Sequence, residues 1–164
     1  MRLTLVTLVL SAMLAPAHAI DVTMCGTVVP EGDVGVLQVD LDCGVLPAGV
    51  TLRRSARLRL NGHTLRGGAR AVLAEFARGS AWVDGPGTVT RAEIGIAGAG
   101  SVRSGRGIEL HLTDVAVRDN GIGVFADRLR LTRVTAEGNR DGIASNYRMK
   151  GDDVLANDNA QFGV

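Results

Sequence analysis

The last third of the chain repeats one pattern of residues three times. The three segments span residues 110–128, 129–148 and 149–164. Val115, Val134 and Val154 coincide when the segments are aligned, so the period is about 20 residues. A fixed period of this size is typical of proteins in which each repeat forms one unit that stacks on the next. The repeat therefore favours a solenoid, in which each unit buries apolar side chains against its neighbours.

Within each repeat, apolar and polar residues alternate over short runs. Leu129 and Leu131, for example, flank Arg130. A period of two predicts strands, because successive side chains of a strand point to opposite faces. Strands this short cannot pair within one unit, but they can pair with the same strand of the next unit. We therefore expect an all-β fold, a parallel β-helix with one coil per repeat and about seven coils.

An asparagine recurs between two strands of each repeat, at Asn120, Asn139 and Asn159. Asparagine tolerates the left-handed backbone that tight turns use. Its side chain can also hydrogen-bond to its copies in the coils above and below. We interpret the three residues as a structural asparagine ladder rather than as a binding site.

The N-terminal segment, 1–19, has the pattern of a secretory signal peptide. Arg2 precedes an apolar stretch over 3–14, and 17–19 (Ala-His-Ala) has the small-x-small pattern of a cleavage site. A membrane-spanning helix needs about 20 apolar residues, and this stretch is shorter, so we expect no stable membrane anchor. A buried N-terminal strand or helix is the alternative. We expect residues 1–19 to be removed and residues 20–164 to form a single β-helix domain, in the periplasm or outside the cell.

The chain has two cysteines, Cys25 and Cys43. Export permits a disulfide between them. A metal site is the alternative, but two thiols without a nearby histidine are poor zinc ligands, and His63 and His111 are far away in sequence. We predict the disulfide, no metal site and no cofactor.

The overall composition excludes some classes of partner without naming one. The formal net charge is +1, which gives no electrostatic reason to expect nucleic acid. Aromatic residues make up only 3% of the chain, too few for a run of base-stacking platforms or an aromatic-lined sugar cleft.

Several stretches resemble the secreted right-handed parallel β-helix proteins. They are Cys25, 40–43 (DLDC), 58–67 (LRLNGHTLRG) and 83–90 (VDGPGTVT). These proteins are relatives of the pectate lyase fold and include the periplasmic β-helix protein of copper-enzyme maturation. The resemblance implies a right-handed coil over nearly all of the chain after the N-terminal segment. It does not imply one activity, because the superfamily contains polysaccharide lyases, glycoside hydrolases, epimerases, adhesins and noncatalytic members.

A catalytic constellation is hard to find in this sequence. The resemblance implies that a lyase would hold calcium with acidic residues and abstract a proton with a basic one, and a hydrolase needs carboxylates in one groove. The strands expected to carry a site, 122–125 and 143–146, offer no carboxylate in their outward slots, which we assign to Gly123, Phe125, Ala144 and Asn146. The carboxylates lie in turns instead, where aspartate is common. If the protein is an enzyme, the candidate catalytic residues are Asp119, Asp141, Asp152, Asp153 and Arg148.

Four further hypotheses concern catalysis or metal binding. Residues 151–153 (Gly-Asp-Asp) resemble a fragment of the polygalacturonase pattern, which we interpret as chance because the other motifs are absent. His63 is a candidate base or a turn residue. Asp114 and Asp127 could join the turn aspartates around calcium, but only under the lyase alternative, because no calcium-loop spacing is present. Delivery of a soft metal, as the resemblance to the copper-maturation protein would imply, needs clusters of Cys, Met or His. The repeats of this sequence contain no such cluster, which argues against this role.

Almost all basic residues are arginines. Arg128, Arg130 and Arg133, with Arg148, could form a column on successive coils that clamps the carboxylates of an acidic polysaccharide. The alternative is a solvated face interleaved with Asp and Glu, and we favour this second interpretation.

The sequence thus predicts an exported β-helix module, structural or polysaccharide-contacting and noncatalytic. The alternative is a polysaccharide lyase, hydrolase or epimerase of the pectate lyase-like superfamily, or a fragment of one. Residues 101–107 read as an insertion between coils, and the chain ends on what should be the third strand of a coil. We therefore expect either a truncated product of a longer protein or end-to-end self-association.

Overall fold

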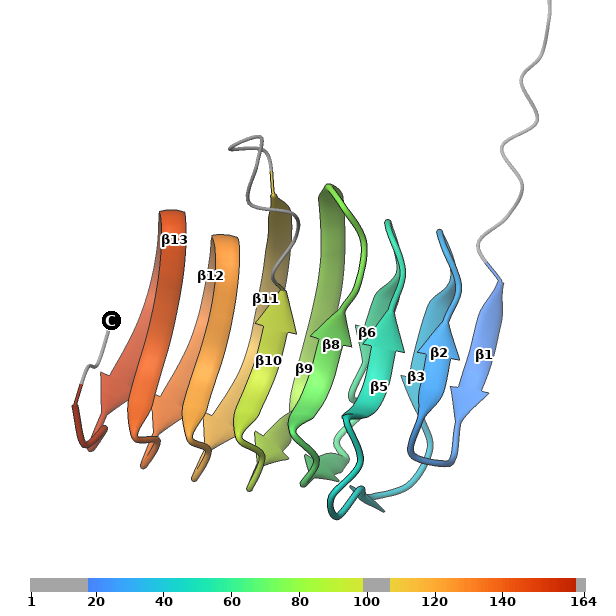
Figure 1. Ribbon diagram of the computed structural model, residues 1–164, viewed down its shortest axis with the longest axis horizontal. Helices are drawn as coiled ribbons and strands as arrows, with labels where there is room; N and C mark the ends of the chain where they lie inside the picture. Colours follow the sequence, from blue (N-terminus) through green and yellow to red (C-terminus); the bar gives the residue numbers. More distant parts are fainter. Residues whose placement is uncertain (1–17, 99–106, 162–164) are drawn as a thin grey trace, which may run out of the picture.

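The computed structural model describes residues 18–98 and 107–161, and these fold into an all-β parallel solenoid (Figure 1). The predicted fold class is confirmed, and no helix occurs among the described residues. Most of the signal peptide and of the predicted insertion, and the chain end at 162–164, lie outside the described part. The strands are β1 (Ala19–Val22), β2 (Thr27–Val29), β3 (Val34–Leu37), β4 (Leu41–Asp42), β5 (Ala48–Leu52), β6 (Arg57–Arg59), β7 (Thr64–Arg66), β8 (Arg70–Ala74), β9 (Gly79–Thr90), β10 (Ile94–Gly98), β11 (Ile108–Arg118), β12 (Ile122–Glu137) and β13 (Asp141–Asn157).

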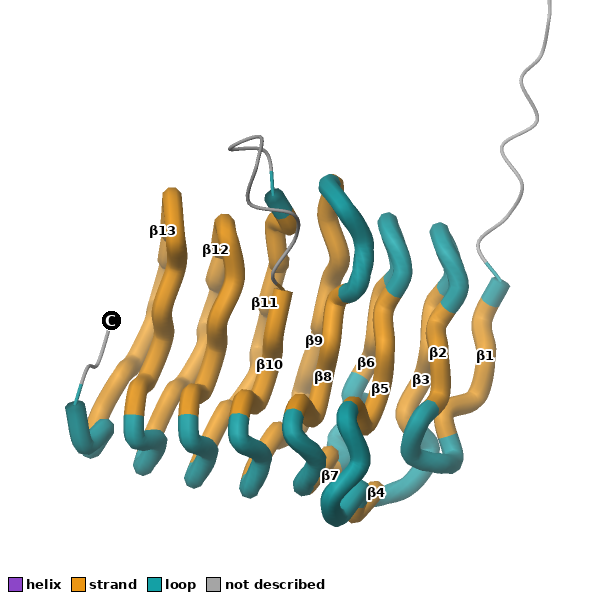
Figure 2. Tube along the Cα trace, in the orientation of Figure 1, coloured by secondary structure: helices purple, strands orange, loops and turns teal. Residues whose placement is uncertain are grey.

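The strands stack in three columns that run along the long axis of the molecule (Figures 1 and 2). Column A is β1, β3, β6 and then parts of β9, β11, β12 and β13. Column B is β2, β5, β8, β10 and parts of β12 and β13. Column C is β4, β7 and parts of β9, β11, β12 and β13. All these pairings are parallel, so each coil covers the previous one. The coil number and the right-handed winding stay predictions.

The observed register matches the alignment of the repeats. Leu110 lies beside Leu129 and Leu129 beside Met149, while Val134 lies beside Val154. The inward positions of each column form continuous apolar rows, because alternate side chains point inward. Full burial of one such aliphatic side chain stabilises the fold by about 1.5–3 kcal/mol. The core is therefore one continuous cluster along the solenoid, built from stacked apolar rows.

The three repeated asparagines form a hydrogen-bonded ladder at the corner between columns C and B. Asn139 Oδ1 accepts bonds from the backbone N and the Nδ2 of Asn120, both at 3.0 Å. Asn159 Oδ1 accepts the same two bonds from Asn139, both at 3.1 Å. The asparagines do not have the left-handed backbone that we expected of them. The positive φ angles lie one residue earlier, at Asp119, Gly138 and Asp158. An asparagine after that bend points inward and satisfies backbone groups that the corner leaves unpaired.

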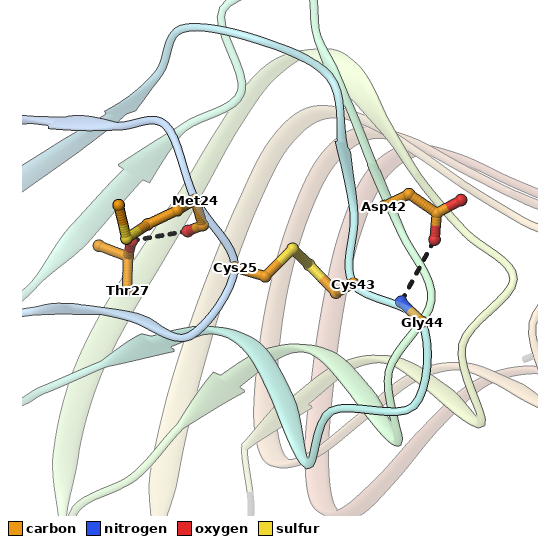
Figure 3. Close-up of a disulfide and its surroundings, with 6 residues drawn as sticks. All are labelled: Met24, Cys25, Thr27, Asp42, Cys43 and Gly44. Atoms are coloured by element: carbon orange, nitrogen blue, oxygen red, sulfur yellow. Dashed lines mark hydrogen bonds between the residues drawn. A yellow bond between two sulfur atoms is a disulfide. The ribbon is translucent and has the colours of Figure 1, made fainter.

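The predicted disulfide between Cys25 and Cys43 is confirmed (Figure 3). It joins the segment before β2 to the residue after β4, with the two Cα atoms 5.4 Å apart. Cys43 is buried against the core, with 4% of its surface exposed. β1 begins at Ala19, beside the predicted cleavage site. Among the described residues, no helix is long and apolar enough to span a membrane.

Candidate basic face

The outward face of column A gathers the most distinctive polar side chains of the described chain. One outward row contains Arg57, Trp82, His111, Arg130 and Lys150, each beside the next in the register. These residues come from five different coils. They meet because they occupy the same outward position of alternating strands whose other side chains are in the core.

The middle of this row is a closed stack. The rings of Trp82 and His111 are stacked with centroids 5.1 Å apart and planes inclined at 27°. On the other side of Trp82, the Arg57 guanidinium carbon lies 5.7 Å from the ring centroid. Arg57 is itself held by Asp84, with Nη1 2.7 Å from Oδ2. Because neighbours cover both faces of the indole, Trp82 has no free face on which a sugar ring could stack.

Beyond the stack, four cations gather on two adjacent coils. We call Arg128, Arg130, Arg148 and Lys150 the basic patch. Arg128 lies beside Arg148, and Arg130 beside Lys150. Together with Glu109 and Leu129 they line a hollow of about 100 Å³.

Glu109 is the one carboxylate that lines this hollow. It accepts a bond from Arg130 Nε at 2.6 Å. Arg148 and Lys150 have no carboxylate partner among the residues that the structure describes. The Nε of Arg128 is buried and has no hydrogen-bond partner there, although its Nη2 donates to the carbonyl of Gly107 at 3.4 Å. The patch is therefore strongly positive, with four cations against one anion.

Two ionisable groups at the edge of the patch have shifted pKa values. The hydrogen bond from Arg130 lowers the pKa of Glu109 below its ordinary value of 4.5. Burial of the ring lowers the pKa of His111 below its ordinary value of 6.5. At neutral pH, Glu109 is therefore charged and His111 is neutral.

Most other arginines in the described part of the chain are paired with a carboxylate of a neighbouring coil or loop. Arg133 is one of them and binds Asp114 through two bonds, of 2.5 and 2.7 Å. The remaining pairs of this kind are Arg53–Glu75, Arg54–Glu31, Arg57–Asp84, Arg66–Asp42 and Arg118–Glu137. Arg133 lies at a corner between columns A and C, so it does not belong with Arg128, Arg130 and Arg148. The solvated-face interpretation describes these paired arginines and does not describe the basic patch.

The candidate catalytic residues lie in different parts of the coil. Asp119 is at the corner before column B. Asp152 ends column A beside Thr132, and Asp153 follows it at the next corner. Asp141 and Arg148 both line a hollow of about 650 Å³ beside β13. The Oδ2 of Asp141 accepts a bond from Arg140 at 3.1 Å, and its Oδ1 is buried without a partner among the described residues.

The outward slots of column B were predicted to hold no carboxylate, and Phe125 and Ala144 occupy two of them. Ala97, Phe125 and Ala144 lie side by side in the register. One predicted slot was wrong, because Gly123 is buried rather than outward. A Cβ on Gly123 would lie 2.4 Å from the carbonyl oxygen of Gly142. The glycine is there because neighbouring coils approach closely at this point. Asn146, another predicted slot, donates through Nδ2 to Asp127 at 3.0 Å.

The acidic and histidine candidates for metal binding do not cluster. No group of three or more His, Cys, Asp or Glu side chains is arranged to hold a metal ion in the described ranges. Asp127 is fully buried and also accepts a bond from the backbone N of Ile108, at 3.0 Å. His63 Nδ1 lies 3.3 Å from Asp40 Oδ1 at a turn of column C. Asp40 also accepts the backbone N–H of Thr64, which lowers the pKa of its carboxyl.

The chain was compared with protein-family models, with curated proteins and with solved structures, and none of them matches. The parallel strand pairing shows a β-solenoid fold, and the function is argued below from the basic face of column A.

Proposed function

We propose that this protein is an exported, noncatalytic β-solenoid that binds an acidic polysaccharide along the outward face of column A. The observation that carries the proposal is the basic patch. Arg128, Arg130, Arg148 and Lys150 surround one small hollow together with a single carboxylate, Glu109. Guanidinium groups bind carboxylates and sulfates through two parallel hydrogen bonds, which suits this ligand class.

The geometry of the column favours a polymer over a small anion. Neighbouring strands lie about 4.8 Å apart, so equivalent side chains repeat at that interval along the axis. A chain with charges on successive sugars can therefore contact successive coils. Because the faces of Trp82 are covered, recognition depends on charge rather than on stacking. Binding of this kind weakens as salt is added.

The proposed location rests on three observations. The N-terminal segment has the pattern of a signal peptide. The Cys25–Cys43 disulfide is of the kind that forms in oxidising compartments. The stretches that resemble secreted right-handed β-helix proteins fit a periplasmic or extracellular protein. Cell fractionation with intact-mass analysis tests this: exported protein should begin at Ile20, and protein retained unprocessed inside the cell contradicts export.

Binding to immobilised polygalacturonate, dextran sulfate and neutral dextran tests the ligand class. The double variant Arg148→Gln, Lys150→Gln should bind the charged polymers about tenfold more weakly, since each cation contributes up to about 1 kcal/mol. The control is Arg70→Gln, Arg91→Gln, which removes the same charge at the start of column B and at the corner that precedes column B. Equal weakening by both variants, or equal binding of neutral dextran, contradicts the proposal.

The same polymers test the enzyme alternative. Each is incubated with the protein, with and without calcium, and the release of oligosaccharides is measured. We expect no release. Release would replace the proposal with the lyase, hydrolase or epimerase alternative. Asp141→Asn and Arg148→Gln would then be the first variants, because these two residues share a hollow.

A further inference from the structure

We infer that His111 strengthens polyanion binding by the basic patch when the pH falls. The inference rests on the proposed function and concerns the regulation of the same face. It starts from the place of His111 in column A, where the ring stacks on Trp82 on one side and adjoins the basic patch on the other.

His111 has Trp82 on one side and Arg130 on the other in the register of column A. The ring is half-buried and stacks on the indole at 5.1 Å. Glu109 is two residues earlier on the same strand and on the same outward face. A proton on His111 would therefore place a positive charge directly beside the Glu109–Arg130 pair.

Charged groups of both signs surround the ring. On its own strand, β11, the neighbour is Glu109. Arg130 belongs to the next coil, and Arg57 and Asp84 belong to the two previous ones. The two carboxylates favour the protonated ring, and the two arginines disfavour it. Because burial of the ring has the largest effect, the pKa is lowered and the free protein binds this proton only in acid.

Protonation changes the face in two ways that act in the same direction. It adds a fifth cation to a surface with one carboxylate beside the patch. It also gives Glu109 a second cationic neighbour, which weakens the ion pair between Glu109 and Arg130. Arg130 can then contact an external anion more readily. By linkage, a bound polyanion must raise the pKa of His111 to the same extent that protonation strengthens binding.

Dextran sulfate is a suitable probe because its sulfates stay charged across the pH range used. Its affinity for the purified protein is measured at about pH 7.5 and at about pH 5.5, at one ionic strength. The wild-type protein should bind more tightly at the lower pH, by up to about fivefold, which is the effect of one unit charge a few ångströms away in water. His111→Gln and His111→Phe should lose this gain, and the second variant keeps a ring on Trp82. His63→Gln, on the turn of column C, is the matched control and should keep it.

A second readout follows the ring itself. The His111 pKa, measured by NMR, should rise when dextran sulfate is added, whereas a purely structural histidine would show no change. The inference is overturned if His111→Gln keeps the pH dependence, or if the wild-type affinity is the same at both pH values while binding persists. Absence of binding at both pH values overturns the proposed function, and the inference with it.

Discussion

At the scale of single residues, the asparagine ladder shows how one buried side chain supports the fold. Asn139 is 1% exposed and uses both of its side-chain polar atoms. Its Oδ1 accepts from Asn120, and its Nδ2 donates to the carbonyl of Val117 at 3.0 Å and to Asn159. Substitution by alanine would remove the acceptor of the buried Asn120 N–H and the side-chain donors to the Val117 carbonyl and to Asn159 Oδ1. Each unsatisfied group costs about 1–3 kcal/mol.

We therefore expect Asn139→Ala to lower the free energy of unfolding by about 3 kcal/mol. Urea denaturation followed by circular dichroism measures this loss. Asn157→Ala is the control, because Asn157 is exposed on column C and its substitution should change the stability by less than about 0.5 kcal/mol. A loss for Asn139→Ala no larger than that of the control would show that the ladder is dispensable.

The sequence reveals a residue's role best where the role recurs in every coil. The asparagines at 120, 139 and 159 recur at the repeat spacing, so their stacking could be predicted. Trp82 and His111 occur once each in the row, and no periodicity marks them. Their contact depends on the register between two coils of unequal length. The buried Gly123 was misplaced for a related reason, since strict alternation fails where the chain bends at a corner.

At the scale of elements, the length of each coil decides whether the pairing of its strands with the next coil could be predicted from the sequence. His111 lies beside Arg130 and Arg130 beside Lys150, which agrees with the register of the aligned repeats. Arg57 lies beside Trp82, but the coil that separates them is longer and its corners differ in length. No alignment of the repeats extends to that coil, so this pairing could not be predicted.

The predicted column of arginines agrees with the structure in part. Arg128 and Arg148 are neighbours in the register, as the alignment indicated, while Arg133 lies at a corner. The partner of Arg130 could have been found by looking one repeat earlier along the chain, where Glu109 stands. An ion pair between coils joins residues that are one repeat apart in sequence, and a search within a single repeat misses it.

The disulfide cross-links the first coils and stabilises them. It closes a loop of 18 residues between the ends of β1 and β4, where the strands are short. In the chain-entropy model such a cross-link stabilises the fold by about 3 kcal/mol. The double variant Cys25→Ser, Cys43→Ser should lose about this much in urea denaturation.

Adding a reductant to the wild-type protein should reproduce that loss. The reductant should leave the double variant unchanged, which makes the variant the control for effects of the reductant elsewhere. Equal stability of the oxidised and reduced wild-type proteins would mean that the stacked strands alone hold the first coils.

At the scale of the whole molecule, a stack of coils is stabilised by interfaces between neighbours. Ion pairs between coils contribute to each interface, so the stability should depend on pH. The hydrogen bonds from Arg130 and Arg133 lower the pKa values of Glu109 and Asp114. A carboxyl whose pKa is lower in the folded state stabilises the fold above its unfolded pKa. That stability is lost as the pH falls through the folded value.

His111 acts in the same direction at a higher pH. Its pKa is lowered by burial, so the unfolded chain binds this proton more readily than the folded protein does. Stability is therefore lost as the pH falls below the ordinary histidine value of 6.5, before the carboxyls begin to lose theirs near their ordinary value of 3.8 to 4.5. We expect the urea midpoint to fall in two stages between about pH 8 and about pH 3. His111→Gln should flatten the first stage and leave the second, and a midpoint that rises on acidification would contradict both assignments. The stability and the proposed binding then depend on pH in opposite ways. Burial disfavours protonation of His111 in the free folded protein, whereas a bound polyanion would favour it.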